Sequence, residues 1–119
     1  MKSETLNIED FKNDLKHFTG SENFYKSSLG LIYTDGIQHV AETVGAYWLI
    51  DLVGSVQYKL KSEPFQSWDL KVKDSKGVIV CTDGNDNVLY TQEIPFTDFP
   101  LEEIQLFAVD NTLMLTSEY

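Results

Sequence analysis

The chain has 119 residues, 42% of them hydrophobic, with 19 acidic residues against 9 basic ones and a net charge of −10. This length and hydrophobicity are typical of a globular domain whose core needs no disulfide or metal, so residues 1–119 are expected to form a single domain. The charge excludes direct nucleic-acid binding, which requires a basic surface that displaces the counterions of the phosphates.

The protein is expected to be cytoplasmic and not to enter a membrane. The first residues, Met1 to Asn7, lack the apolar stretch of a signal peptide. The longest apolar run, from Val44 to Val56, is too short to span a bilayer and contains Asp51. The single cysteine, Cys81, cannot form an internal disulfide and fits a reducing environment.

A short helix, a loop and a short strand are predicted at the start of the chain. Apolar residues at helical spacing from Ile8 to Phe18 indicate the helix, with Asn7 as its N-cap and Gly20 just beyond its end. Ser21–Gly30 reads as a connecting loop and Leu31–Thr34 as a short strand.

A single long helix is then predicted from Gly36 to about Lys61. Its apolar residues recur at steps of three and four, which is the spacing of one helix face, and Pro64 ends it. These residues are Ile37, Val40, Val44, Trp48, Leu52 and Val56. A helix of this length would be roughly 37 Å long and would cross the whole domain. We expect the rest of the chain to pack on it, with Trp48 at least largely buried.

After Pro64, apolar residues alternate with polar ones, which is the pattern of β-strands. Strands are predicted at Trp68–Val72, Val78–Thr82 and Val88–Ile94 and, as a last hairpin, at Ile104–Val109 and Leu113–Thr116. The fold class is therefore α+β, with a short N-terminal helix and one long central helix packed on an antiparallel sheet of four to five strands. We expect these strands to follow one another as a meander.

One polar turn has the oxygen ligands of a calcium loop. Asp83, Asn85 and Asn87 alternate along the chain, but Val88 and Ile94 stand where an EF-hand needs glycine and glutamate. A hairpin turn rich in Asp and Asn is the better interpretation. We expect no metal at this turn.

Zinc binding or catalysis would depend on a few scattered residues. His39 and Glu42 share a helix face, but together with His17 and Cys81 they show no recognised zinc spacing, so no metal and no cofactor are expected. Cys81 lies in an apolar strand, where a small buried thiol is favoured over a nucleophile. Asp51 is the one ionisable residue in the most apolar stretch and is either buried or, as we favour, turned to solvent.

The second half of the chain carries acids that no lysine accompanies. After Lys76, the last basic residue, they are Asp83, Asp86, Glu93, Asp98, Glu102, Glu103, Asp110 and Glu118. These acids either guide a basic partner or merely keep the domain soluble. Aromatic residues in predicted loops either cover the ends of the core or meet a partner; they are Phe24, Tyr25, Phe96 and Phe99. The candidate partner-binding residues are Asp98, Glu102, Glu103, Phe96 and Phe99.

Short motifs along the chain are similar to those of a known family. They are Phe18-Thr19-Gly20, Tyr33-Thr34-Asp35-Gly36, Ala46-Tyr47-Trp48-Leu49, Asp83-Gly84-Asn85, Tyr90-Thr91, Phe96-Thr97-Asp98-Phe99-Pro100 and Ser117-Glu118-Tyr119. From Phe18 onward the chain resembles a bacterial family of small domains of unknown function that occurs on mobile elements. The resemblance implies no activity and no site residue. It implies a context, because small acidic proteins of mobile elements are often inhibitors of host nucleic-acid machinery, anti-CRISPR proteins among them.

Three functions are compatible with these patterns. The first is a non-enzymatic acidic interaction domain that binds or inhibits a basic nucleic-acid-handling protein, as a monomer or homodimer, without contacting nucleic acid or a membrane. The second is a small-molecule-binding or enzymatic domain with a pocket between helix and sheet that uses Asp51, His39 or Cys81. The third is a structural domain that dimerises through an edge strand or through the Trp48 face.

Overall fold

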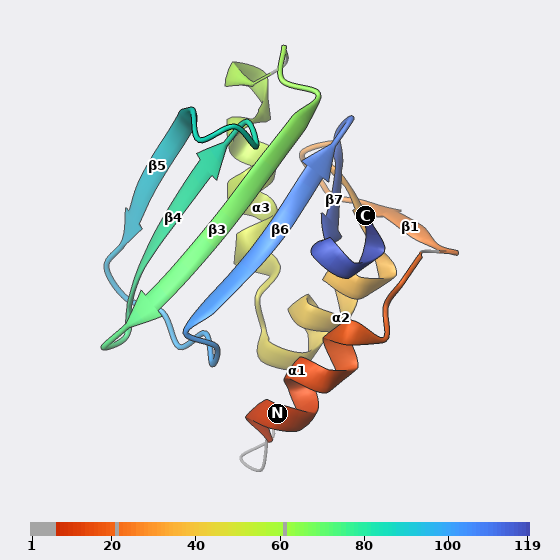
Figure 1. The fold of residues 1–119 in the computed structure, drawn as a ribbon, viewed down its shortest axis with the longest axis vertical. Coiled ribbons are helices and arrows are strands. Elements are labelled where there is room, and N and C mark those ends of the chain that lie inside the picture. The colour runs from red at the N-terminus through yellow and green to blue at the C-terminus, as the bar shows by residue number, and fades with distance from the viewer. Residues whose placement is uncertain (1–6, 21, 61) are drawn as a thin grey trace.

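A computed structural model describes residues 7–20, 22–60 and 62–119 as a β-sheet with helices layered on one of its faces (Figure 1). The helices are α1 (Ile8–Lys16), α2 (Asp35–Val44) and α3 (Tyr47–Val56), with the short 3-10 turns η1 (Gln57–Lys59) and η2 (Thr116–Glu118). The strands are β1 (Phe24–Lys26), β2 (Ile32–Thr34), β3 (Phe65–Lys73), β4 (Lys76–Thr82), β5 (Val88–Ile94), β6 (Glu103–Val109) and β7 (Thr112–Leu115). The general α+β class is as predicted, but the architecture predicted within it is wrong.

The predicted long helix does not form, because the chain breaks at Gly45 into α2 and α3. Gly45 has φ 69° and ψ 38°, the left-handed conformation in which glycine commonly ends a helix. The amide of Ala46 donates to the carbonyl of Ala41 (3.0 Å), which closes α2 in a Schellman motif. A glycine within a helical pattern is the sequence signal for such a break, but apolar spacing continues on both sides of it. The predicted end of the helix at Lys61 lies outside the described residues.

The sheet has seven strands in the order β1-β2-β7-β6-β3-β4-β5, rather than the predicted four or five. The strands predicted after Pro64 and the one predicted at Leu31–Thr34 are present as β3 to β7 and β2. β1 lies in the stretch that reads as a loop, since its three residues are too few to show an alternating pattern. β2 and β7 pair in parallel, so the sheet is mixed and not purely antiparallel.

Strands β3 to β6 form a Greek key, which corrects the predicted meander. Tight turns join β3, β4 and β5, and the chain then crosses the end of the sheet through residues 95–102 to place β6 on the other side of β3. Trp68 accordingly has Cys81 beside it on β4 and Leu106 beside it on β6. Because β6 does not pair with β5, β5 remains at the edge of the sheet (Figure 1).

The core lies between the helices and one face of the sheet. Its centre is Trp68, which is 0% exposed and donates from Nε1 to Oε1 of Gln66 (3.0 Å). Trp48, expected near the centre of a long helix, is partly buried at the margin of this core. The contact between α2, α3, β6 and β7 is filled with apolar side chains, and the cavity left there measures only about 10 Å³.

The carboxylate of Glu118 joins η2 to the start of α2. Its Oε1 accepts hydrogen bonds from the Thr34 hydroxyl (2.7 Å) and the Leu115 amide (2.9 Å). Its Oε2 accepts one from the Gly36 amide (3.1 Å). The first amides of a helix have no acceptor within the helix and favour a nearby negative charge. The motif that contains Thr34 and the motif that contains Glu118 therefore meet in the fold and stabilise it.

Candidate functional site

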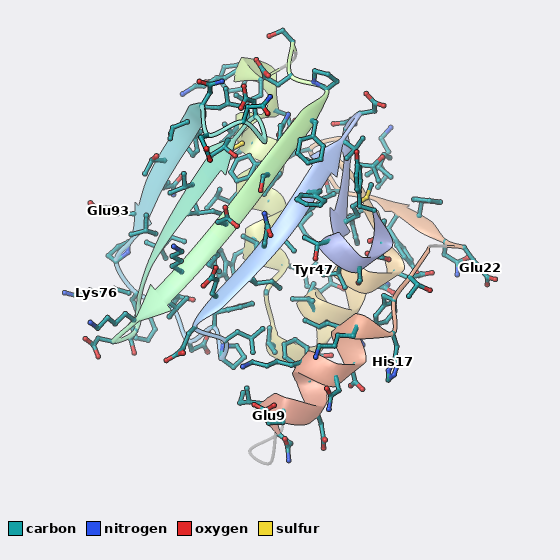
Figure 2. The ribbon with its side chains drawn as sticks, viewed as in Figure 1. Glu9, His17, Glu22, Tyr47, Lys76 and Glu93 are labelled. Atoms are coloured by element: carbon teal, nitrogen blue, oxygen red, sulfur yellow. The ribbon has the colours of Figure 1, made fainter. Side chains whose placement is uncertain are left out.

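β5 is an edge strand, and no described strand pairs with its outer side. Its inner side pairs with β4. Every second residue of an edge strand directs its backbone N–H and C=O away from the sheet, where another strand can bind them. Natural proteins often protect such edges with lysine, proline or a β-bulge. β5 contains neither lysine nor proline, its one charged residue is Glu93, and its pairing with β4 is irregular only beside Cys81 and Thr82. Figure 2 shows Glu93 at the outer border of the sheet.

Helix α3 has an apolar face that the core does not cover completely. Its buried residues are Leu49, Ile50, Val53 and Val56. A second face is formed by residues spaced i, i+3, i+4 and i+7, which are Trp48, Asp51, Leu52 and Ser55. Trp48 and Leu52 on this face are only partly buried. The helix therefore keeps apolar surface available beside the sheet edge.

A groove of about 570 Å³ lies between this face of α3 and the end of β5; we call it the β5–α3 groove. Its lining residues are Ser28, Leu29, Trp48, Asp51, Leu52, Ser55, Gln92, Glu93, Ile94 and Pro95. A groove with apolar residues along part of its wall, beside an open strand edge, is similar to the geometry with which several domains bind an extended peptide as an additional strand. In that mode the backbone hydrogen bonds supply affinity, and pockets for alternate side chains supply specificity.

The charged residues along the β5–α3 groove are both acidic: Asp51 is on its helix side, and Glu93 is on β5 with its side chain on the other face of the sheet. Asp51 and Glu93 are exposed, and no lysine is among the lining residues. Neither carboxylate forms an ion pair or a side-chain hydrogen bond with another described residue. Two lysines lie outside the groove: Nζ of Lys59 is 5.8 Å from the centroid of the Tyr90 ring, nearer the start of β5, and Lys76 is exposed on β4.

The five predicted partner-binding residues are not all on the surface. Phe99 is only 5% exposed and belongs to the core; the amide of Phe99 donates to the Thr97 hydroxyl (3.2 Å). The other ring, Phe96, is 73% exposed. The remaining predicted residues, Asp98, Glu102 and Glu103, are exposed. Sequence could not separate the two rings, because both lie in an irregular segment where no periodicity marks an inner side.

The acids of the second half are not gathered on one surface. The turns at the end of the sheet where β3 begins carry Asp83, Asp86 and Asp110. The opposite end carries Asp98, Glu102 and Glu103, together with Lys71, Lys73 and Lys76. At that end Lys71 stands directly beside Glu103 in the ladder. Glu118 is hydrogen-bonded within the fold, so the acidic tail does not present a single negative face.

The residues considered for chemistry lie in three different places. Cys81 is 0% exposed in β4, and burial raises its pKa to about 12, so its thiol is protonated and inert. Asp51 is exposed on α3, as favoured from the sequence. His39 lies on α2 with Nε2 3.8 Å from Oδ2 of Asp14, beside a recess of about 350 Å³ that Asp35 also lines.

The turn at Asp83 is held by its own side chains. Its Oδ2 accepts from the side-chain amide of Asn87 (2.8 Å) and its Oδ1 from the backbone amide of Asn85 (2.8 Å), and these hydrogen bonds lower the pKa of Asp83.

Within residues 7–20, 22–60 and 62–119, no three His, Cys, Asp or Glu side chains are placed to hold a metal ion. In the same ranges, the helices are too short or too polar to cross a bilayer.

The β5–α3 groove combines two surfaces that were named separately from the sequence as possible dimer contacts, an edge strand and the Trp48 face. Their proximity was not predicted, because the Trp48 face reads as part of a continuous core-facing stripe. The edge position of β5 also depends on the crossing of residues 95–102, for which the sequence carries no local signal. The spacing of Trp48, Asp51, Leu52 and Ser55 is the one feature that indicates a second helix face.

These features define a small α+β domain with a mixed sheet and one long accessible strand edge. The chain belongs to the family of unknown function DUF6876, whose family model matches residues 9–119. This confirms the resemblance to an uncharacterised domain family. No curated protein and no solved structure matches the chain significantly.

Proposed function

We propose that this domain is a non-enzymatic interaction module that binds an extended segment of a partner protein along β5. The observation that supports the proposal is the open edge of the seven-residue strand β5, with Trp48 and Leu52 of α3 partly exposed beside it. The segment adds a strand to the sheet, its backbone pairs with β5, and its apolar side chains cover Trp48 and Leu52. The opposite edge is less suitable, because β1 offers only three residues for pairing.

The proposal is tested by selecting peptides from a displayed random library against the immobilised domain and mapping them by amide NMR. We expect the shifts to concentrate in β5 and α3. The outward amides of β5 should exchange with solvent more slowly when the peptide is bound, because they then donate hydrogen bonds. Failure to select any peptide, or selected peptides that map to β1 or to the helices alone, would contradict strand addition at β5.

Two proline variants, Thr91→Pro and Gln92→Pro, make this test specific. Neighbouring residues of a strand direct their N–H groups to opposite sides. One of the two variants therefore removes a hydrogen bond to β4, and the other, which we call the edge variant, removes an N–H at the open edge. We expect the edge variant to keep the circular dichroism spectrum of the wild type and to lose peptide binding. Peptide binding that survives in the folded variant would show that the edge is not used.

A narrower proposal is that the domain is an inhibitor whose acidic surface binds to a basic nucleic-acid-handling protein. The acids are divided between two ends of the sheet, so they support this proposal less well than the open edge supports strand addition. The part of the chain that could still act in this way is the loop at residues 95–102, where Asp98, Glu102 and Phe96 are exposed.

Replacing Asp98, Glu102 and Glu103 together by their amides tests that loop. Exposed carboxylates change folding by within about 0.5 kcal/mol each, so the variant should fold. If binding occurs along β5, a selected peptide should dissociate from the variant at the wild-type rate, and only its long-range electrostatic steering should weaken. Clearly faster dissociation from the variant would instead assign docking to this loop.

A further inference from the structure

We infer that the segment bound along β5 alternates apolar and basic residues, an inference that rests on the function proposed above. The two sides of β5 face different surroundings. Tyr90, Gln92 and Ile94 pair with the buried β4 residues Cys81, Ile79 and Gly77 and therefore face the helices. Thr91 and Glu93 face the open side of the sheet. The side chains of a strand added to β5 alternate in the same way. Its odd-numbered and even-numbered residues therefore contact different surfaces, one on the helix side and one on the open side.

The helix side of an added strand meets apolar surface. Trp48, Leu52 and Ile94 line the β5–α3 groove and remain partly exposed, and Leu29 at its border is 55% exposed. Covering this surface is favourable in proportion to the apolar area removed from water. The residues of the segment that face α3 are therefore apolar.

The open side of an added strand meets Glu93. Directly opposite and diagonal residues of neighbouring strands are close enough to interact, so a basic side chain there is favourable and an acidic one unfavourable. Asp51 is a second carboxylate but lies on the helix side of the groove, so it adds to the negative potential around the segment without contacting the basic side chains on the open side. No lysine lines the groove; Lys76 lies on the open face of β4, diagonal to Glu93, and an incoming strand meets Glu93 from the other side of β5.

This charge pattern also disfavours a second copy of the chain as the occupant. β5 contains no basic residue that could meet Glu93 of another copy. Each copy carries a net charge of −10, so two copies repel each other at low salt. A basic segment from a different protein has neither disadvantage.

The test uses three labelled peptides of seven residues, the length of β5. All have valine at odd positions, and lysine, glutamine or glutamate at even positions. Fluorescence anisotropy should show the lysine peptide binding roughly tenfold more tightly than the glutamate peptide at low salt, with the glutamine peptide between them. The difference should shrink as salt is raised, because the two carboxylates are exposed.

Two double variants locate the preference. Asp51→Asn with Glu93→Gln removes the groove charges, and Asp98→Asn with Glu102→Gln removes the same number of charges outside the lining of the groove. We expect only the first to make the lysine and glutamate peptides bind equally, while the glutamine peptide keeps its affinity for both variants. Circular dichroism checks that each variant is folded.

Each other result overturns a distinct claim. If both double variants lose the preference for the lysine peptide equally, the preference comes from the net charge of the domain and not from the groove. If all three peptides bind equally to the wild type, the alternating basic pattern is wrong, although strand addition stands. If none binds and light scattering shows a dimer that the edge proline variant abolishes, the occupant is a second copy. If none binds and no dimer forms, strand addition at β5 is itself wrong.

Discussion

At the scale of single residues, burial controls the chemistry of Cys81. Its thiol has 0% exposure, and the pKa is raised to about 12 from an ordinary value of 9.0. The folded state therefore holds the proton more tightly than the unfolded state does. This contribution to stability is fully present below about pH 9 and is lost as the pH rises toward 12.

Alkaline unfolding tests this linkage. Between about pH 9 and 11, the free energy of unfolding of the wild type should fall, relative to that of Cys81→Ala, by about 1 kcal/mol per pH unit. Urea denaturation at several pH values measures the two slopes, and comparing slopes removes the constant effect of the smaller side chain. Parallel profiles for the two proteins, or rapid reaction of the native thiol with a disulfide reagent at pH 8, would contradict the buried thiol.

Glu118 is a second residue with a specific expected effect. Glu118→Ala should lower the free energy of unfolding by about 2–3 kcal/mol, because Thr34, Gly36 and Leu115 each lose an acceptor. Glu118→Gln should lower it less, since an amide oxygen can still accept. Glu102→Ala is the matched control at an exposed acid and should change stability by within about 0.5 kcal/mol. Equal effects at positions 118 and 102 would rule out the role of Glu118 at the start of α2.

At the scale of elements, Gly45 decides whether the middle of the chain forms one helix or two. Alanine in place of an exposed glycine inside a continuous helix stabilises it by up to about 1 kcal/mol. At Gly45 the left-handed backbone reverses the sign, and Gly45→Ala should destabilise the domain by about 1–2 kcal/mol. Thermal or urea unfolding measures this directly. A stabilised variant would show that α2 and α3 are continuous.

The elements that sequence predicted correctly are those with a long local signal. The strands after Pro64 have alternating residues and Asp- or Gly-rich turns between them, which identify them without any tertiary information. β1 has no such signal; it pairs with β2 over three residues, and the Tyr25 hydroxyl donates to Asp35 at the start of α2 (2.9 Å). The crossing of β6 past β4 and β5 likewise depends on pairing between segments far apart in sequence. For the same reason, the edge of β5 and the β5–α3 groove could not be predicted.

At the scale of the whole molecule, β7 joins two parts of the sheet. It pairs with β2 on one side and with β6 on the other, so among the described strands only β7 connects the β1–β2 hairpin to the rest of the sheet. The helices cover one face of this continuous sheet (Figure 1). The domain should therefore unfold as one unit.

Two probes of the same transition test this cooperativity. In Trp48→Phe, fluorescence reports on Trp68 at the centre of the core, while far-UV circular dichroism reports mainly on the helices. We expect the two urea transitions to coincide. Clearly different midpoints for the two probes would show that the domain does not unfold as one unit.

The position of β7 also has a consequence for synthesis on the ribosome. The Gly36 amide and its acceptor on Glu118 are 82 residues apart, and β2 must likewise wait for β7 before it has a parallel neighbour. At a translation rate of roughly 5–20 residues per second, the start of α2 emerges roughly 4–16 s before these partners exist. During that interval the apolar faces of α2 and α3 have no completed sheet to cover them. The apolar faces of α2 and α3 are therefore buried in full only after the last two strands have left the exit tunnel.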